Sequence, residues 1–158
     1  MRRRGKNRRH FLRTRPYRSI HTVSNGDGME KTCDLARRDI KGLIFVNLVD
    51  FDSKYGHRND ADGYAKALSS FDSDLKKLDL LLGEGDAAIV TADHGCDPSD
   101  VSTDHTREYV PIVAFGRRLK SGVNLGVRES FCDIGATVAQ LLGLGLKTGK
   151  SFAEEIVL

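Results

Sequence analysis

Residues 43–60 read LIFVNLVDFDSKYGHRND, an apolar run that passes directly into a polar one. Leu43 to Val49 is almost continuously apolar, which is typical of a strand buried on both faces of a parallel sheet. The polar residues Asp50 to Asp60 come directly after it. Ligand sites in open α/β sheets lie beyond the carboxyl ends of the strands. This polar segment is therefore a candidate site.

The same order of elements continues downstream. Apolar residues recur at steps of three and four from Tyr64 to Leu82, which predicts a helix that Asp60 caps and Gly83 ends. Ala87 to Ala92 reads as a second buried strand, and the polar residues 93–97 follow it.

Further elements are predicted on both sides of this unit: a helix over 27–39, a strand over 110–115, and a last helix that Asp133 caps and that runs to Leu142 before Gly143. Alternation of strand and helix indicates right-handed crossovers. The predicted fold is α/β, with a mostly parallel sheet covered by helices.

Charge is unevenly distributed along the 158 residues. Residues 1–20 hold nine Lys and Arg and no acid, which leaves 16 basic against 22 acidic residues in the remainder. Such an arm can bind phosphates, but it lacks interleaved aromatic residues and a helical charge stripe, so nucleic acid is not expected as a partner.

Apolar run lengths and cysteine spacing bear on the cellular compartment. No apolar run is long enough for a membrane span, and no apolar stretch of a signal peptide follows the basic residues, so no membrane is expected. Cys33, Cys96 and Cys132 are widely spaced, which is typical of a reducing cytoplasm.

Three of the five histidines lie in polar segments close to a carboxylate: Asp52 with His57, Asp93 with His94, and Asp104 with His105. Imidazole and carboxylate without paired thiolates suit Zn²⁺ or Mn²⁺, and two such ions can hold the oxygens of a phosphoryl transfer. Each piece alone could be a turn or a surface histidine. Together, at the ends of predicted strands, they predict a metal site.

Several segments resemble phosphopentomutases of the alkaline phosphatase superfamily. Residues 47–52, NLVDFD, followed by 55–58, YGHR, are similar to a metal-binding segment of that family. Residues 91–98, TADHGCDP, and 103–108, TDHTRE, resemble the next two such segments, and 149–152, GKSF, resembles the C-terminal signature. The resemblance runs from about His21 to the end of the chain.

The resemblance implies two Mn²⁺ ions. Asp52, His57 and His105 match the ligands of one ion, and Asp93 and His94 match ligands of the other; Asp50 matches the motif but not a ligand. It also implies a pentose phosphate substrate, because the family interconverts ribose 1-phosphate and ribose 5-phosphate and the deoxyribose equivalents. A phosphothreonine of the enzyme donates its phosphoryl group to give a sugar bisphosphate and then recovers one.

Family members are longer at the N-terminus. The resemblance thus implies that this chain is a partial alkaline-phosphatase-like core, which lacks the N-terminal core segment and most of the cap domain. Residues 1–20 form a basic non-family arm, 21–40 the end of the cap and the return to the core, and 41–158 the C-terminal part of the metal-binding core. Thr14 and Thr22 do not match the context of the phosphothreonine. No catalytic nucleophile is therefore assigned, the chain is expected to be inactive alone, and a complementing N-terminal polypeptide is a candidate partner.

The arm has a second interpretation. Residues 6–11, KNRRHF, can be encoded by bases that, read one nucleotide further on, give Lys-Ile-Glu-Asp-Ile-Phe, which resembles a family segment. Residues 1 to about 18 are then an out-of-frame reading. Two other functions stay open: a phosphatase or phosphoglycerate mutase of the same superfamily, and a non-catalytic remnant with a nucleic-acid-binding arm.

Overall fold

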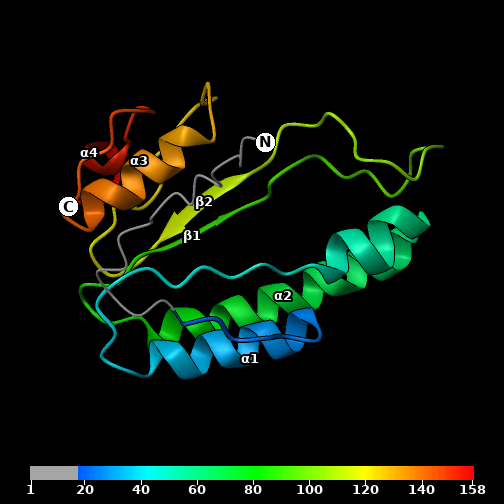
Figure 1. Cartoon of the computed structure of the whole chain (residues 1–158), viewed down its shortest axis with the longest axis horizontal. Coiled ribbons are helices and arrows are strands. Elements are labelled where there is room, and N and C mark those ends of the chain that lie inside the picture. The colour runs from blue at the N-terminus through cyan, green and yellow to red at the C-terminus, as the bar shows by residue number, and fades with distance from the viewer. Residues whose placement is uncertain (1–17) are drawn as a thin grey trace, which may run out of the picture.

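The computed structural model describes residues 18–158 (Figure 1). A pair of helices, α1 and α2, lies on one side, the strands β1 and β2 run beside it, and α3 and α4 lie on the far side of the strands (Figure 1). Most of the basic arm predicted over residues 1–20 lies outside the described residues. Between residues 18 and 158, none of the helices combines the length and apolar character needed to cross a membrane.

The helix pair confirms two predicted helices. In α1, Asn25–Ala36, the hydroxyl of Ser24 accepts the N–H of Asp27 at 3.1 Å and caps the helix. In α2, Ala61–Leu81, the carboxylate of Asp60 accepts the N–H of Gly63 at 2.8 Å, as the sequence predicts. The helices pack through a small apolar core of buried Met29, Cys33 and Leu78, with Leu48, Phe71 and Leu75 against it.

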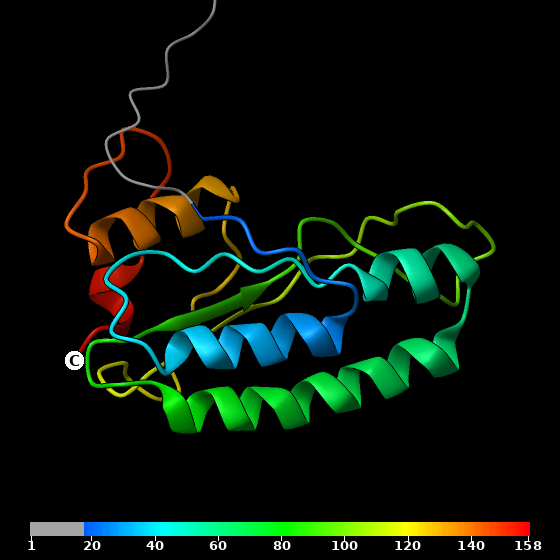
Figure 2. The same cartoon turned by 60° about the horizontal axis from the view of Figure 1, so that its bottom comes forward.

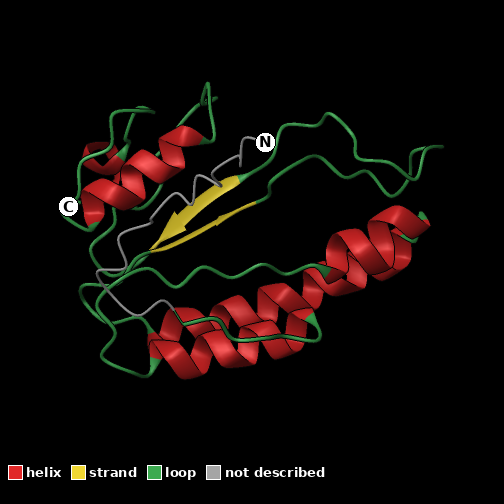
Figure 3. Cartoon of the chain, in the orientation of Figure 1, coloured by secondary structure: helices red, strands yellow, loops and turns green. Residues whose placement is uncertain are grey.

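The prediction of a strand over Leu43 to Val49 is wrong. The segment is extended and runs in the same direction as β1 (Figures 1 and 2), but it belongs to no sheet and is drawn as loop in Figure 3. Leu43 and Phe45 are 61% and 84% exposed. A strand needs a neighbour for its backbone groups, and no described segment lies in hydrogen-bonding register with this one.

The mostly parallel sheet is also not observed. The sheet of the described chain consists of β1, Ala88–Thr91, and β2, Ile112–Phe115, which pair antiparallel with Thr91 opposite Ile112. Both strands lie where the sequence predicts strands. The connection between them, residues 92–111, contains no helix, so the chain reverses direction instead of crossing over. This long connection carries the polar residues that follow β1.

The C-terminal part packs around α3, Cys132–Leu141, and α4, Ala153–Ile156. Asp133 does not cap α3 as predicted, because the cap position is Phe131 and Asp133 lies inside the first turn. Its buried carboxylate instead accepts the N–H of Lys150 at 2.8 Å and faces Arg128 at 3.3 Å. Asp133 thus anchors the segment leading to α4, in which Phe152 is completely buried.

Candidate metal centre

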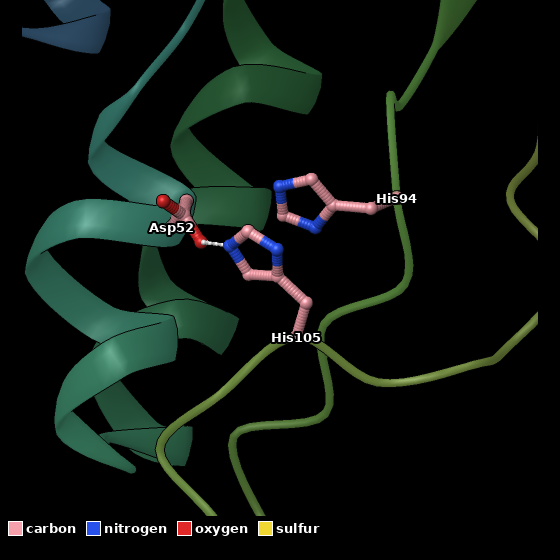
Figure 4. Close-up of side chains that lie close together, drawn as sticks. All are labelled: Asp52, His94 and His105. Carbon is pink, nitrogen blue, oxygen red and sulfur yellow. Dashed lines mark ion pairs between the residues drawn. The ribbon is translucent and has the colours of Figure 1, made fainter.

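The candidate centre is formed by side chains from two separate parts of the chain. Asp52 lies in a short π-helical turn, Phe51–Tyr55, and His57 lies in the 3₁₀ turn that follows, Gly56–Arg58. His94 and His105 come from the long connection between β1 and β2. Figure 4 shows Asp52 and His105 pointing toward each other, with the ring of His94 beside that of His105.

The distances place Asp52 at the centre of this group. Its Oδ1 lies 3.3 Å from Nε2 of His57 and 3.4 Å from Nε2 of His105. One ligand atom each from Asp52, His94 and His105 lies within 4.8 Å of the others. The rings of His94 and His105 are stacked, with centroids 3.6 Å apart and planes 15° apart.

Backbone carbonyls set the orientation of two imidazoles. Nδ1 of His57 is hydrogen-bonded to the carbonyl of Thr103, and Nδ1 of His94 to the carbonyl of Gly95 at 3.0 Å. A carbonyl oxygen only accepts, so each Nδ1 must carry the hydrogen, and in a neutral ring Nε2 then keeps its lone pair. Partners of this kind orient metal-binding histidines in proteins.

A backbone bridge brings His94 and His105 together. Gly95 and Thr106 form an isolated antiparallel bridge, in which Thr106 N–H donates to the carbonyl of Gly95 at 3.1 Å. A Cβ atom at Gly95 would lie 2.6 Å from the carbonyl oxygen of Thr106, so the close approach requires glycine. Each histidine directly precedes a bridge residue, so the two are diagonal neighbours across the antiparallel bridge, and their rings stack there.

A second close contact joins the two parts of the site. Gly56 is buried, and a Cβ atom there would lie 2.3 Å from Sγ of Cys96. Burial raises the pKa of the Cys96 thiol, and the nearby carboxylates of Asp52, Asp97 and Glu108 raise it further. The thiol is therefore neutral and serves as packing between the turn at 51–58 and the connection after β1.

The fit of a cation can be tested at Asp52. Its Oδ1 is buried and has no hydrogen-bond partner among the described residues, although two imidazole Nε2 atoms face it. In a neutral His57, whose hydrogen lies on Nδ1, the lone pair of Nε2 would face a lone pair of the Asp52 oxygen, which is unfavourable. A cation between them, either a proton or a metal ion, removes the conflict. Carboxylate oxygen and imidazole nitrogen are ligands that Zn²⁺ and Mn²⁺ accept, so the residues fit a metal ion.

Similarity of the sequence to known proteins shows the family of the chain. The sequence profile described as Metalloenzyme superfamily matches residues 15–146. The chain belongs to the metalloenzyme superfamily. Among its relatives, the phosphopentomutase of Clostridioides difficile (strain 630) is 52% identical over 139 residues, which are 87% of this chain and 36% of the relative. That of Carboxydothermus hydrogenoformans is 53% identical over 135 residues, 85% of this chain and 35% of the relative. The metalloenzyme chain thus spans about 36% of the length of these proteins.

The structure brings four of the five predicted ligands of this metalloenzyme together and leaves the fifth at the edge of the group. Asp52, His57, His94 and His105 converge, whereas the carboxylate of Asp93 is 86% exposed and its Oδ1 lies 3.6 Å from Nε2 of His94. Asp93 therefore lies at the rim of the group. The division into a pair of sites, with Asp93 and His94 on the second ion, stays a prediction.

Asp50 has a structural role in the metalloenzyme, in which it connects two segments of the chain. It is buried, its Oδ2 accepts the N–H of Asn25 at 2.9 Å, and its Oδ1 pairs with Nζ of Lys54 at 3.0 Å. The N–H of Asp50 in turn donates to Oδ1 of Asn25 at 2.9 Å. Asp50 thus links the start of the π-helical turn to the start of α1. Both of its carboxylate oxygens have partners in this contact or in the ion pair with Lys54.

Three positioning residues escaped the sequence reasoning: Gly95, Thr103 and Thr106. Each acts mainly through its backbone, in the bridge or in the hydrogen bond to His57. The sequence gives two signals: all three residues lie in the family-like segments 91–98 and 103–108, and a small residue, Gly or Thr, directly follows each of His94 and His105.

Proposed function

We propose that this chain provides the metal-binding part of a phosphopentomutase, which interconverts ribose 1-phosphate and ribose 5-phosphate and the deoxyribose equivalents. The observation that carries the proposal is the pairing of about 50% identity to phosphopentomutases with a buried, unpartnered carboxylate oxygen among three imidazoles. The described cysteines, Cys33, Cys96 and Cys132, are all unpaired, which supports a cytoplasmic location.

The proposed metal is Mn²⁺, with Asp52, His57 and His105 on one ion and Asp93 and His94 on the other. Bound there, the ions would neutralise charge on a phosphate group. The protein contributes orientation: the carbonyls of Thr103 and Gly95 hold the rings of His57 and His94, and the Gly95–Thr106 bridge holds His105 in place. Asp52 supplies the anionic oxygen between the rings.

A cleft beside the centre supports a phosphate-bearing substrate. It has a volume of about 1050 Å³ and is lined by Asp93 and His94 of the centre and by the residues of β2. Arg107 lines it, and no carboxylate of the described residues is paired with this guanidinium in the ion pairs observed, so it is available for a phosphate. The volume exceeds what a pentose phosphate needs, and further polypeptide would have to fill the remainder.

The complete reaction is proposed to require a complementing polypeptide. The chain spans about 36% of the length of the phosphopentomutases it matches, and neither Thr14 nor Thr22 stands in the context of the family's phosphothreonine. We expect no conversion of ribose 1-phosphate by this chain alone with Mn²⁺, even after priming with a sugar bisphosphate.

The test is a coupled assay of ribose 5-phosphate formation with Mn²⁺. The chain is assayed alone and together with a polypeptide comprising the part of the Clostridioides difficile phosphopentomutase that its 139-residue match leaves uncovered. Turnover by the mixture, lost in Asp52→Asn, supports the proposal. A formed complex that turns over phosphoglycerate or simple phosphate esters, but no pentose phosphate, would replace it with one of the related activities.

A further inference from the structure

Two reciprocal hydrogen bonds join the start of α1 to the turn that carries Asp52. The N–H of Asn25 donates to Oδ2 of Asp50 at 2.9 Å, and the N–H of Asp50 donates to Oδ1 of Asn25 at 2.9 Å. Figure 2 shows the two segments beside each other. Because hydrogen bonds are directional, a pair between the same two residues fixes the orientation of the turn relative to α1 as well as its distance from α1.

The side chain of Asn25 is not needed to cap α1. Ser24 is the cap residue, and its hydroxyl accepts the N–H of Asp27 at 3.1 Å. Nδ2 of Asn25 is buried and has no hydrogen-bond partner among the described residues, which lowers stability. The Asn25 side chain therefore serves the link to Asp50 rather than the helix in which it lies.

The turn that follows Asp50 determines where Asp52 points. Asp50 is 7% exposed, and its Oδ1 pairs with Nζ of Lys54, a residue of the same turn, at 3.0 Å. Oδ1 of Asp52 has no hydrogen-bond partner among the described residues and faces two imidazoles. Its position is thus set by the backbone of the turn. π-Helical turns of this kind are frequent at functional sites.

We propose that Asn25 is a positioning residue of the metal centre. Its Oδ1 holds the N–H of Asp50, this contact orients the π-helical turn, and the turn directs Oδ1 of Asp52 toward the imidazoles. Asn25 does not belong to the group of ligand atoms itself. The proposal rests on the metal binding in the proposed function, and it adds that the centre is coupled to the start of α1.

Calorimetric titration with Mn²⁺ tests this role. Asn25→Ala removes the acceptor of the Asp50 N–H and should lower the affinity for Mn²⁺ at least about tenfold, as the loss of an indirect partner of a metal ligand does at other sites. Asn25→Ser keeps a polar group at the helix start, but its hydroxyl is too short to reach that N–H. It should therefore lose affinity likewise, even if Asn25→Ala does not fold.

Ser24→Ala is the matched control, because it removes the cap of the same helix one residue away. It should lose stability in a urea melt and still bind Mn²⁺ like the wild type. A spectroscopic readout separates ligand geometry from fold stability. The visible absorption of bound Co²⁺ depends on the geometry of its ligands, so it should change in the two Asn25 variants and stay the same in Ser24→Ala.

The outcomes separate this inference from the proposed function. Wild-type affinity for Mn²⁺ in the Asn25 variants, an unchanged Co²⁺ spectrum in them, or an equal loss of affinity in Ser24→Ala would each overturn the positioning role. A wild-type chain that binds no Mn²⁺ would overturn both. If the variants behave as expected but the coupled assay of the proposed function shows no turnover of pentose phosphate, the role of Asn25 stands and the proposed function alone fails.

Discussion

Gly95 shows how a single residue determines the geometry of the metal centre. Its missing side chain permits the bridge to Thr106, and the bridge holds His94 and His105 side by side. In Gly95→Ala, the new methyl group would meet the Thr106 carbonyl at 2.6 Å, and the bridge must open. We expect a loss of about 1–3 kcal/mol in stability together with weaker metal binding. Gly85→Ala, where nothing lies within 4 Å, should change neither in a urea melt or a Mn²⁺ titration.

Asp133 makes a second prediction at the scale of the residue. The N–H of Lys150 lowers the pKa of the Asp133 carboxyl, and the guanidinium of Arg128 lowers it further against the opposing effect of burial. Because the pKa is lower in the folded state than in the unfolded state, the ionised carboxylate stabilises the fold at neutral pH. This contribution is lost as the pH falls below about 4 and through the folded pKa.

Denaturant unfolding at several pH values measures this effect. Asp133→Asn should lower stability at pH 7, and its stability should fall less steeply than that of the wild type between pH 5 and the acid limit. Equal slopes for the two proteins would show that Asp133 is not a source of the pH dependence. Asp72→Asn, on the exposed face of α2, is the control with an ordinary surface ion pair.

For single residues, the candidate metal ligands can be predicted from the sequence better than the contacts that position them. Asp52, His57 and His105 could be named from their residue types and their places in polar segments close to a carboxylate, and the structure places them together. The bridge between Gly95 and Thr106 could not be predicted, because it pairs backbone groups of two loop segments whose side chains carry no pairing pattern. The anchoring role of Asp133 was missed for a similar reason: its partner Lys150 N–H is 17 residues away.

The junction between α3 and α4 illustrates how elements are held together by buried polar groups. Thr137 is completely buried, its hydroxyl donates to the carbonyl of Asp133 at 2.7 Å, and it accepts the N–H of Phe152 at 3.0 Å. In Thr137→Val, the shape is kept but the buried N–H of Phe152 loses its partner, which should cost about 1–3 kcal/mol. Thr137→Ser keeps the hydroxyl and should lose clearly less. Equal destabilisation of the two variants in thermal melts would refute the role of the hydrogen bond.

Helices could be predicted from the sequence more reliably than strand pairing. The existence of α1 and α2 and the start of α2 at Asp60 could be predicted from local signals, whereas α1 is shifted from the predicted 27–39 to Asn25–Ala36, with Ser24 as its cap. The direction of pairing between β1 and β2 depends on the path of residues 92–111, which no periodicity encodes. Residues 43–49 have the composition of a buried strand, but pairing requires a neighbour, and the described chain provides none.

The molecule as a whole combines a candidate metal-binding group with apolar surfaces that no described residue covers. The turns that precede α2 carry Asp52 and His57, and the connection between β1 and β2 carries His94 and His105. Figure 4 shows Asp52, His94 and His105 close together. The apolar residues 43, 45 and 49 and the large cleft along β2 stay uncovered. The chain spans about 36% of the length of its matched relatives.

The most direct test of this account is calorimetric titration of the metal-free chain with Mn²⁺ and with Zn²⁺. The account predicts saturable binding by the wild type and at least a tenfold loss of affinity in Asp52→Asn, equivalent to about 1.4 kcal/mol, because Oδ1 of Asp52 lies between the imidazoles. Asp72→Asn should bind like the wild type. A wild-type chain that binds neither ion, or an Asp52→Asn variant that binds as tightly as the wild type, would contradict the central claim.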